Sequence, residues 1–195
     1  MHVVVALMAA GASRRMGGTD KLCKVWRGSP LLAHVAKTAK RGVTASRSGR
    51  VEMIACLSTA RFYPRAACLR GLGVKKLHVR DATKGMSASL RAAVTYANRR
   101  KADTLIIIPG DLAGLAPASV HAIRSAMSRA PSQALRAFDG TGVGHPTALP
   151  RVLFPKLMHL QGDEGARSLL GTARKIRLKG ARLDFDRPED FTRPT

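Results

Sequence analysis

Acidic residues are scarce in this sequence, and the scarcity is uneven. The 195 residues include 12 Asp and Glu against 34 Lys and Arg, which gives a formal net charge of +22. Residues 1–102 hold 21 basic and 3 acidic side chains, whereas residues 103–195 hold 13 and 9. An excess of this size favours anionic partners such as phosphate, nucleic acid or an anionic surface, but it does not choose among them.

Cysteines and long apolar runs are also few. Cys23, Cys56 and Cys68 form no CxxC pair, which argues against a disulfide framework or a zinc knuckle. The early apolar run at residues 3–10 is too short to cross a membrane, and no basic segment precedes it as a signal peptide requires. We therefore expect a cytoplasmic protein without a membrane partner.

Aromatic residues make up only 4% of the chain, with one Trp, two Tyr and five Phe. A surface that binds single-stranded nucleic acid usually stacks bases on aromatic rings, and this sequence supplies few of them. It also contains no zinc-finger or RNA-recognition signature. A specific nucleic-acid partner is therefore not expected, and a basic nucleic-acid-binding protein is kept as an alternative.

Strand-like and helix-like apolar patterns alternate along the chain. Runs of β-branched and apolar residues predict strands at 3–8, 51–57, 74–79, 104–108, 133–138, 175–178 and 182–185. Helical spacing predicts helices at 31–39, 61–72, 87–99, 118–129, 153–160 and 164–172, with a last helical turn at 188–191. This alternation predicts an α/β fold, with a largely parallel sheet between helices and one domain over residues 1–195.

A loop of small and basic residues directly follows the first predicted strand. Sheets of this kind bind ligands beyond the carboxyl ends of their strands, where small residues let backbone amides approach a phosphate. The candidate contacts are small, hydroxyl-bearing or basic: Ala9, Ala10, Gly11, Ser13, Arg14, Arg15 and Lys21. We predict phosphate binding here, although the loop has no Walker signature; the alternative is a solvated loop with incidental charges.

Carboxylates follow two other predicted strands. Asp111 comes after the Ile-rich strand, where a carboxylate can help to hold Mg²⁺ or can simply stabilise a turn. If residues 182–185 form a strand, Asp184 and Asp186 lie on one face and could complete a metal site with Asp111. For Glu189 and Asp190 we favour an acidic helix start.

Three further segments contain candidate ligand contacts. A helix predicted at 87–99 begins beside serines that either cap it or leave amides free for a base edge or an anion. The second segment contains His145 in a Gly-rich stretch, and this histidine is either a ligand contact or a structural residue. The third segment is residues 162–167. The residues of interest in these segments are Gly85, Ser87, Ser89, His145, Asp163 and Arg167.

Taken together, these segments resemble the nucleotidyltransferases of molybdenum cofactor biosynthesis, within the NTP transferase superfamily. The similar segments run in family order: LMAAGASRRMGGTDKL (7–22), GSPLLAHV (28–35), KGMSASLRAA (84–93), IIIPGDLAGL (106–115), GVGHPTALPRVLFPKLMHLQGDEGAR (142–167) and DFDRPEDF (184–191). The GMSASLR, GHP and GDEGAR segments favour the molybdopterin cytidylyltransferase branch over the guanylyl branch.

The resemblance implies a three-layer α/β/α nucleotide-binding domain of the GT-A-like type, with a mostly parallel, mixed sheet. It implies a Mg²⁺-dependent enzyme that transfers CMP from CTP to the terminal phosphate of molybdopterin and releases pyrophosphate. A molybdoenzyme or a maturation protein is the further partner that this reaction implies. Guanylyl transfer to molybdopterin and nucleotidyl transfer to a sugar or polyol phosphate are the enzymatic alternatives.

The resemblance also implies roles for individual residues. The 9–21 loop would hold the triphosphate, and Arg15, Lys21 and Asp111 would be catalytic. Asp111 and Asp186 would bind the metal, with Asp184 as a further candidate. The remaining implied contacts are to the base and ribose at Gly85, Ser87 and Ser89, and to the acceptor at His145, Asp163 and Arg167.

Overall fold

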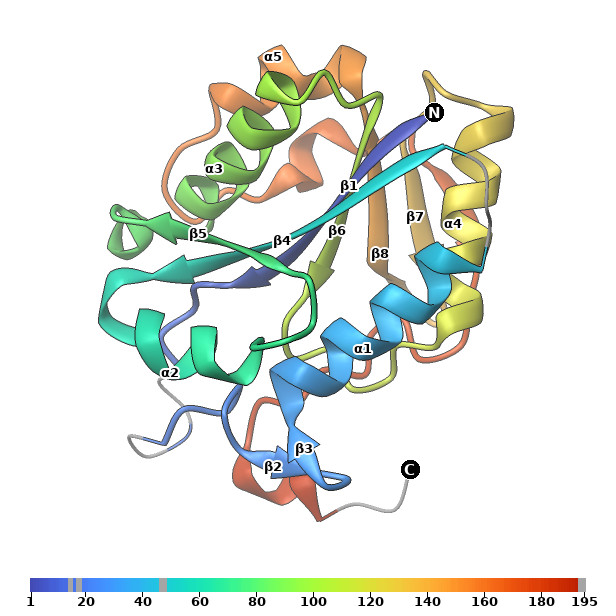
Figure 1. The fold of residues 1–195 in the computed structure, drawn as a ribbon. Helices are drawn as coiled ribbons and strands as arrows, with labels where there is room; N and C mark the ends of the chain where they lie inside the picture. Colours follow the sequence, from blue (N-terminus) through green and yellow to red (C-terminus); the bar gives the residue numbers. More distant parts are fainter. Residues whose placement is uncertain (14–15, 17–18, 46–48, 193–195) are drawn as a thin grey trace.

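The computed structural model describes residues 1–13, 16, 19–45 and 49–192, and its centre is a seven-stranded sheet (Figure 1). The strand order is β5-β4-β1-β6-β8-β7-β9. These strands are β1 (His2–Ala9), β4 (Arg50–Ser58), β5 (Lys75–Val79), β6 (Thr104–Pro109), β7 (Leu135–Phe138), β8 (Val143–Pro150) and β9 (Arg174–Arg177). Only the pairings of β8 are antiparallel, so the sheet is mixed and mostly parallel, as predicted.

Helices cover both faces of this sheet and complete three layers (Figure 1). One face carries α1 (Leu31–Thr44), α2 (Phe62–Cys68) and α4 (Pro117–Arg129); the other carries α3 (Met86–Arg99) and α5 (Phe154–Met158). Short 3₁₀ helices occur at Thr59–Arg61, Ala82–Lys84, Arg151–Leu153, Ala166–Leu169 and Pro188–Phe191. A separate two-stranded hairpin consists of β2 (Val25–Trp26) and β3 (Ser29–Pro30).

The central position of β1 in the sheet explains why its sequence shows no alternation of apolar and polar residues. Val3, Val5 and Leu7 pack into the layer under α1 and α4, whereas Val4 and Ala6 pack into the layer under α3 and α5. A strand buried on both faces needs apolar side chains at every position. The α/β architecture was therefore predictable from its strongest strands.

Strand β8 is the main element that the sequence patterns missed. Its segment contains Pro146 and Pro150, and proline inside a run argues against a strand because it lacks an N–H donor. In the structure, Arg136 and Ala137 of β7 pair with Thr147 and Gly144, so that His145 and Pro146 bulge from the ladder. Pro146 is tolerated because it lies in this irregularity.

Two predicted elements near the C-terminus are wrong. The predicted helix at 164–172 is only the 3₁₀ helix Ala166–Leu169, and the predicted strand at 182–185 is absent. Leu183 and Asp184 instead close turns through hydrogen bonds to Gly180 and Arg182. The described part of the chain contains no helix that is long and apolar enough to cross a membrane.

Candidate active site

The loop after β1 and the Gly110–Asp111 turn after β6 leave the same edge of the sheet. β1 and β6 are parallel neighbours, and Met8 at the end of β1 lies opposite Pro109 at the end of β6. Carboxyl ends of adjacent parallel strands are where α/β sheets bind ligands. The fold therefore brings together two segments that are about 90 residues apart in the sequence.

Lys21 lies between two carboxylates at this edge. Its Nζ is 2.5 Å from Asp111 Oδ2 and donates a hydrogen bond of 2.8 Å to Asp186 Oδ1. Burial lowers the pKa of Lys21, but the charges and hydrogen bonds of Asp111 and Asp186 outweigh burial, and the net shift is upward. Lys21 is therefore a fixed positive charge that both carboxylates position.

Phe185 is the residue that brings Asp186 to this place. Its side chain is buried and packs edge-on against Trp26 and Phe191, at centroid distances of 5.2 and 5.0 Å. Its backbone N–H donates a 3.0 Å hydrogen bond to the Asp111 carbonyl. The Asp-Phe-Asp segment is thus anchored by its central ring and not by the strand pairing that we predicted.

Asp190 has the structural role predicted for it. Its Oδ2 accepts hydrogen bonds of 2.8 Å from the backbone N–H groups of Asp186 and Arg187, at the start of the 3₁₀ helix Pro188–Phe191. These bonds satisfy backbone donors that the helix start leaves free. They also fix the backbone that carries Asp186.

The carboxylates at this edge suit a small divalent cation. Mg²⁺ needs only one or two protein carboxylates, because water and substrate phosphates complete its coordination. Asp111 and Asp186 both approach Lys21, and the pKa of Asp184 is raised by partial burial and by the charges of these two carboxylates. The described residues form no cluster of three metal-ligating side chains, and a cation held by two carboxylates would take its other oxygens from water or substrate.

A buried arginine that the sequence patterns missed ties the 9–21 loop to α2. Arg65 is fully buried and binds Asp20 through two contacts, Nε to Oδ2 at 2.8 Å and Nη2 to Oδ1 at 3.0 Å. It also donates to the Ala9 carbonyl at 2.6 Å and to Ser13 Oγ at 3.3 Å. One side chain therefore holds both ends of the loop, next to Lys21.

The candidate nucleotide and acceptor segments meet at the start of α3. Gly85 has φ of +103°, and a Cβ there would lie 2.3 Å from the carbonyl carbon of Gly162, so a side chain has no room. The Ser87 N–H donates a 3.1 Å bond to the Gly162 carbonyl. Ser87 is fully buried, and its hydroxyl has no hydrogen-bond partner in the described structure. Ser89 of the same helix is also buried.

The other predicted residues have varied surroundings. Ala9 is buried at the end of β1, Ala10 and Ser13 are half-buried, and Gly11 is exposed. Arg14 and Arg15 lie outside the described residues. Asp163 and Arg167 are exposed on the stretch that follows α5, and Gly162 of this stretch abuts α3.

His145 lies at the irregularity in β8 and is half-buried. Its Nδ1 lies 3.3 Å from the carbonyl oxygen of Ile107 in β6. Burial lowers the pKa of His145 to about 4; the Ile107 hydrogen bond and Asp111 oppose the shift, and Arg136 reinforces it. The imidazole is therefore neutral near pH 7 and adds no positive charge to the site.

This depressed pKa predicts an acid sensitivity that can be measured. Between pH 6.5 and about 4 the unfolded chain binds a proton at residue 145 and the folded chain does not, so the free energy of unfolding decreases as pH falls. Between pH 7 and 4.5 we expect urea titrations to show a loss about 2 kcal/mol larger for the wild type than for His145→Gln. Equal losses in the two proteins would show that His145 is not held neutral.

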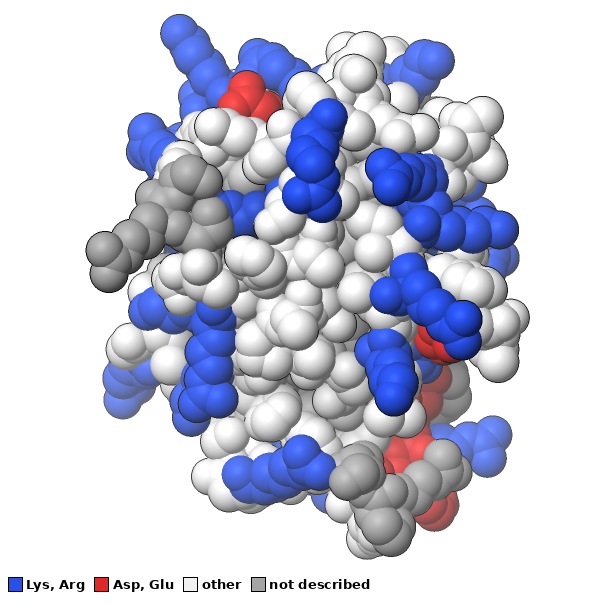
Figure 2. Space-filling model, turned by 90° about the vertical axis from the view of Figure 1, so that its right-hand side faces the viewer, with Lys and Arg blue, Asp and Glu red and all other residues white. Residues whose placement is uncertain are grey.

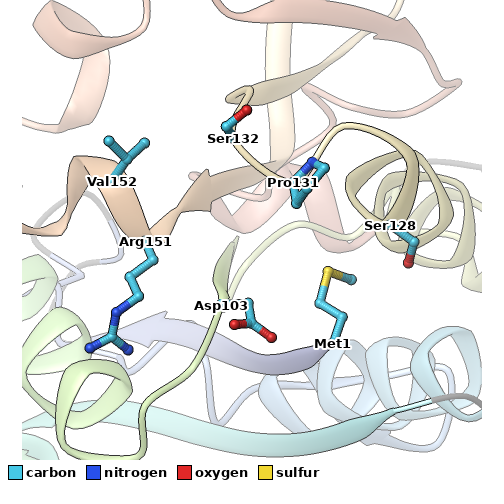
Figure 3. A pocket seen from close by; sticks show the side chains of 7 residues that line it. All are labelled: Met1, Asp103, Ser128, Pro131, Ser132, Arg151 and Val152. Atoms are coloured by element: carbon cyan, nitrogen blue, oxygen red, sulfur yellow. The ribbon is translucent and has the colours of Figure 1, made fainter.

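A separate hollow of about 630 Å³ lies at the opposite edge of the sheet (Figure 3). It is lined by Met1, Asp103, Ser128, Pro131, Ser132, Arg151 and Val152. Asp103 accepts a 2.7 Å bond from the His2 N–H, and Arg151 donates to the Ala102 carbonyl and to Asn98. Its charged groups thus stabilise strand ends.

The sequence matches the MobA-like NTP transferase domain family over residues 5–178. The chain is 30% identical to the purine catabolism protein PucB of Bacillus subtilis (strain 168), over 97% of this chain and 94% of that protein.

Solved structures with the same fold include Rv0371c of Mycobacterium tuberculosis H37Rv. The TM-score is 0.79 at 28% identity, over 98% of this chain and 97% of that one. A complex of the same protein with manganese matches at a TM-score of 0.77 and 26% identity, over 97% and 96% of the two chains. The CTP complex of CMP:2-keto-3-deoxy-manno-octonic acid synthetase shares the fold at a TM-score of 0.72 and 15% identity, over 97% and 95%.

Proposed function

The chain belongs to the MobA-like NTP transferase domain family and is a nucleotidyltransferase, and we propose that it transfers CMP from CTP to the terminal phosphate of molybdopterin. The observation that carries the proposal is the position of Lys21 between Asp111 and Asp186, at the end of a loop suited to phosphate. A fixed cation beside two carboxylates, at the end of this loop, supports the proposal that a triphosphate binds here. We expect the reaction to take place in the cytoplasm.

The reaction needs charge stabilisation and positioning more than covalent catalysis. An oxygen of the acceptor phosphate forms a bond to the α-phosphorus of CTP, the bond to the β-phosphate oxygen breaks, and pyrophosphate leaves. Lys21 would stabilise the negative charge that develops on pyrophosphate, and Arg15 is proposed to assist it. The acceptor phosphate is already anionic, so the site needs no strong general base.

Asp111 and Asp186 are proposed to hold Mg²⁺, with Asp184 as a further candidate. Bound there, the cation would supply positive charge beside the α-phosphate. The described complex of a relative with manganese supports a divalent cation in this family.

The choice of CTP rests on the start of α3. The hydroxyl of Ser87 is buried without a partner, which is costly unless a ligand group binds to it. Gly85, Ser87 and Ser89 lie in the segment that resembles the cytidylyl branch. A structural neighbour solved with CTP is compatible with this choice, and PucB, named for purine catabolism, specifies neither the nucleotide nor the acceptor.

A pyrophosphate-release assay tests the proposal directly. With Mg²⁺ and molybdopterin, we expect kcat/KM for CTP to exceed that for GTP, ATP and UTP by at least about tenfold, because hydrogen bonds to the base discriminate strongly. A preference for GTP would move the protein to guanylyl transfer. Turnover only with a sugar or polyol phosphate would replace the acceptor, and no turnover with any acceptor would contradict the proposal.

A further inference from the structure

Arg136 of β7 is a half-buried arginine with no carboxylate partner among the described residues. Its Nε is buried and makes no hydrogen bond, and no described acidic side chain forms an ion pair with its guanidinium. A partly buried cation without a counter-charge destabilises the free protein. The structure therefore contains a cationic group whose natural counterpart is a bound anion.

The strand register places Arg136 on the side of the sheet where the acceptor segments lie. Leu135 packs into the layer under α1 and α4, so the adjacent Arg136 points to the opposite face, toward α3 and α5. Arg136 pairs with Thr147 of β8, which in turn pairs with Ile107 of β6. The Ile107 carbonyl is the group that contacts His145, so Arg136 and His145 belong to one neighbourhood.

A second arginine lies close to the first. Arg167 is exposed on the 3₁₀ helix Ala166–Leu169, whose apolar residues pack against the same layer as Ala134, two residues before Arg136. The pKa of Arg136 is lowered first by half-burial and then by repulsion from Arg167. No described carboxylate forms an ion pair with Arg167 either. The two arginines are thus close enough to repel each other, and neither forms an ion pair with a described carboxylate.

We propose that Arg136 and Arg167 form the subsite that binds the phosphomonoester of the acceptor. This inference rests on the proposed nucleotidyl transfer, and it assigns a role to Arg136 that no sequence motif indicated. A guanidinium offers parallel N–H donors that match a phosphate, and a dianionic phosphate compensates two arginines. His145 beside them is neutral and leaves the charge balance to the arginines.

The triphosphate of the nucleotide is the alternative anion for this subsite, but the position of Arg136 in the sheet argues against it. The triphosphate loop follows β1, and β6 and β8 separate β1 from β7 in the sheet. Lys21, at the end of that loop, already has its own place beside Asp111. The acceptor side is therefore the side that Arg136 serves.

Steady-state kinetics of Arg136→Gln separate these two sources of phosphate. We expect KM for molybdopterin to rise by about 10- to 100-fold, since charge-assisted hydrogen bonds to phosphate are lost, and KM for CTP to stay within about twofold. Arg129→Gln is the matched control, because Arg129 is exposed at the end of α4 near the opposite edge. A rise in KM for CTP instead would assign Arg136 to the triphosphate and overturn the proposal.

A binding measurement keeps the subsite testable even if molybdopterin is not the acceptor. Titration with inorganic phosphate should raise the Tm of the wild type and of Arg129→Gln more than that of Arg136→Gln. Without phosphate, Arg136→Gln should melt at the wild-type temperature or above, because an unpaired, half-buried charge is removed. Equal increases in Tm with phosphate in all three proteins would overturn the subsite. If Arg136→Gln responds less to phosphate than the other two proteins but molybdopterin is not turned over, only the proposed acceptor is overturned.

Discussion

Replacement of Asp111 by Asn is expected to reduce kcat at least about 100-fold while the protein stays folded. The substitution keeps the size and the hydrogen-bonding oxygen of the side chain but removes its negative charge. That charge lies 2.5 Å from the Lys21 ammonium and is the leading electrostatic contribution that raises the pKa of Lys21. A neutral amide would hold both Lys21 and a divalent cation less firmly, so the developing charge on pyrophosphate loses its stabilisation.

The same substitution at the other end of β6 provides the control. Asp103 lies just before this strand, as Asp111 lies just after it, and binds the His2 N–H at the edge away from the site. Asp103→Asn should retain turnover within about twofold, since it alters charge far from the substrate. Pyrophosphate release measures the turnover of both variants, and circular dichroism shows whether they are folded. Near-normal turnover in Asp111→Asn would show that Asp111 is not part of the catalytic machinery.

The placement of Asp111 and Lys21 at one edge was predictable because it follows from topology. A parallel sheet brings the carboxyl ends of its strands to the same edge, so residues that follow two strong strands must lie near each other. The 9–21 loop and the Gly110–Asp111 turn both obey this rule. No contact between individual side chains had to be known in advance.

The parts that were missed depend on contacts between distant residues. Asp186 was predicted beside Asp111, but through a strand that is absent. The hydrogen bond of Phe185 to the Asp111 carbonyl and the packing of its ring against Trp26 position Asp186 instead, and neither contact has a local sequence signal. Strand β8 was hidden because its prolines argue against a strand and its bulge interrupts the alternation of side chains. Arg136 was hidden because an arginine in a strand is normally a surface residue.

The large positive charge is only partly explained by the site. Figure 2 shows Lys and Arg spread over one face of the molecule with few acidic residues among them. Some of the excess is used structurally: Glu52 binds Arg50, Arg100 and the Tyr96 hydroxyl, at 3.1, 3.0 and 2.7 Å. The scattered distribution of the other cations suits general attraction of anionic substrates better than one specific surface.

Arg65→Met is expected to lower the free energy of unfolding by about 3–5 kcal/mol and to reduce turnover at least about tenfold. The variant leaves the Asp20 carboxylate buried without its bidentate partner, and it leaves the Ala9 carbonyl without a donor. Because Asp20 directly precedes Lys21, the loop that carries the ammonium would lose its anchor. Urea denaturation and pyrophosphate release measure the two losses separately.

The double variant Asp20→Asn/Arg65→Met separates stability from positioning. Removing both charges eliminates the uncompensated carboxylate, and Asn can still accept the hydrogen bond that Asp20 Oδ1 receives from the Leu22 N–H. We therefore expect the double variant to be destabilised by at least about 1 kcal/mol less than the sum of the two single losses. Its turnover should stay low, because no side chain then ties Ala9 and Ser13 to α2. If turnover recovered together with stability, Arg65 would act only as a structural counter-ion. If Arg65→Met does not fold, Arg65→Lys replaces it in the same comparison, because lysine keeps the charge but cannot bind Asp20, Ala9 and Ser13 at once.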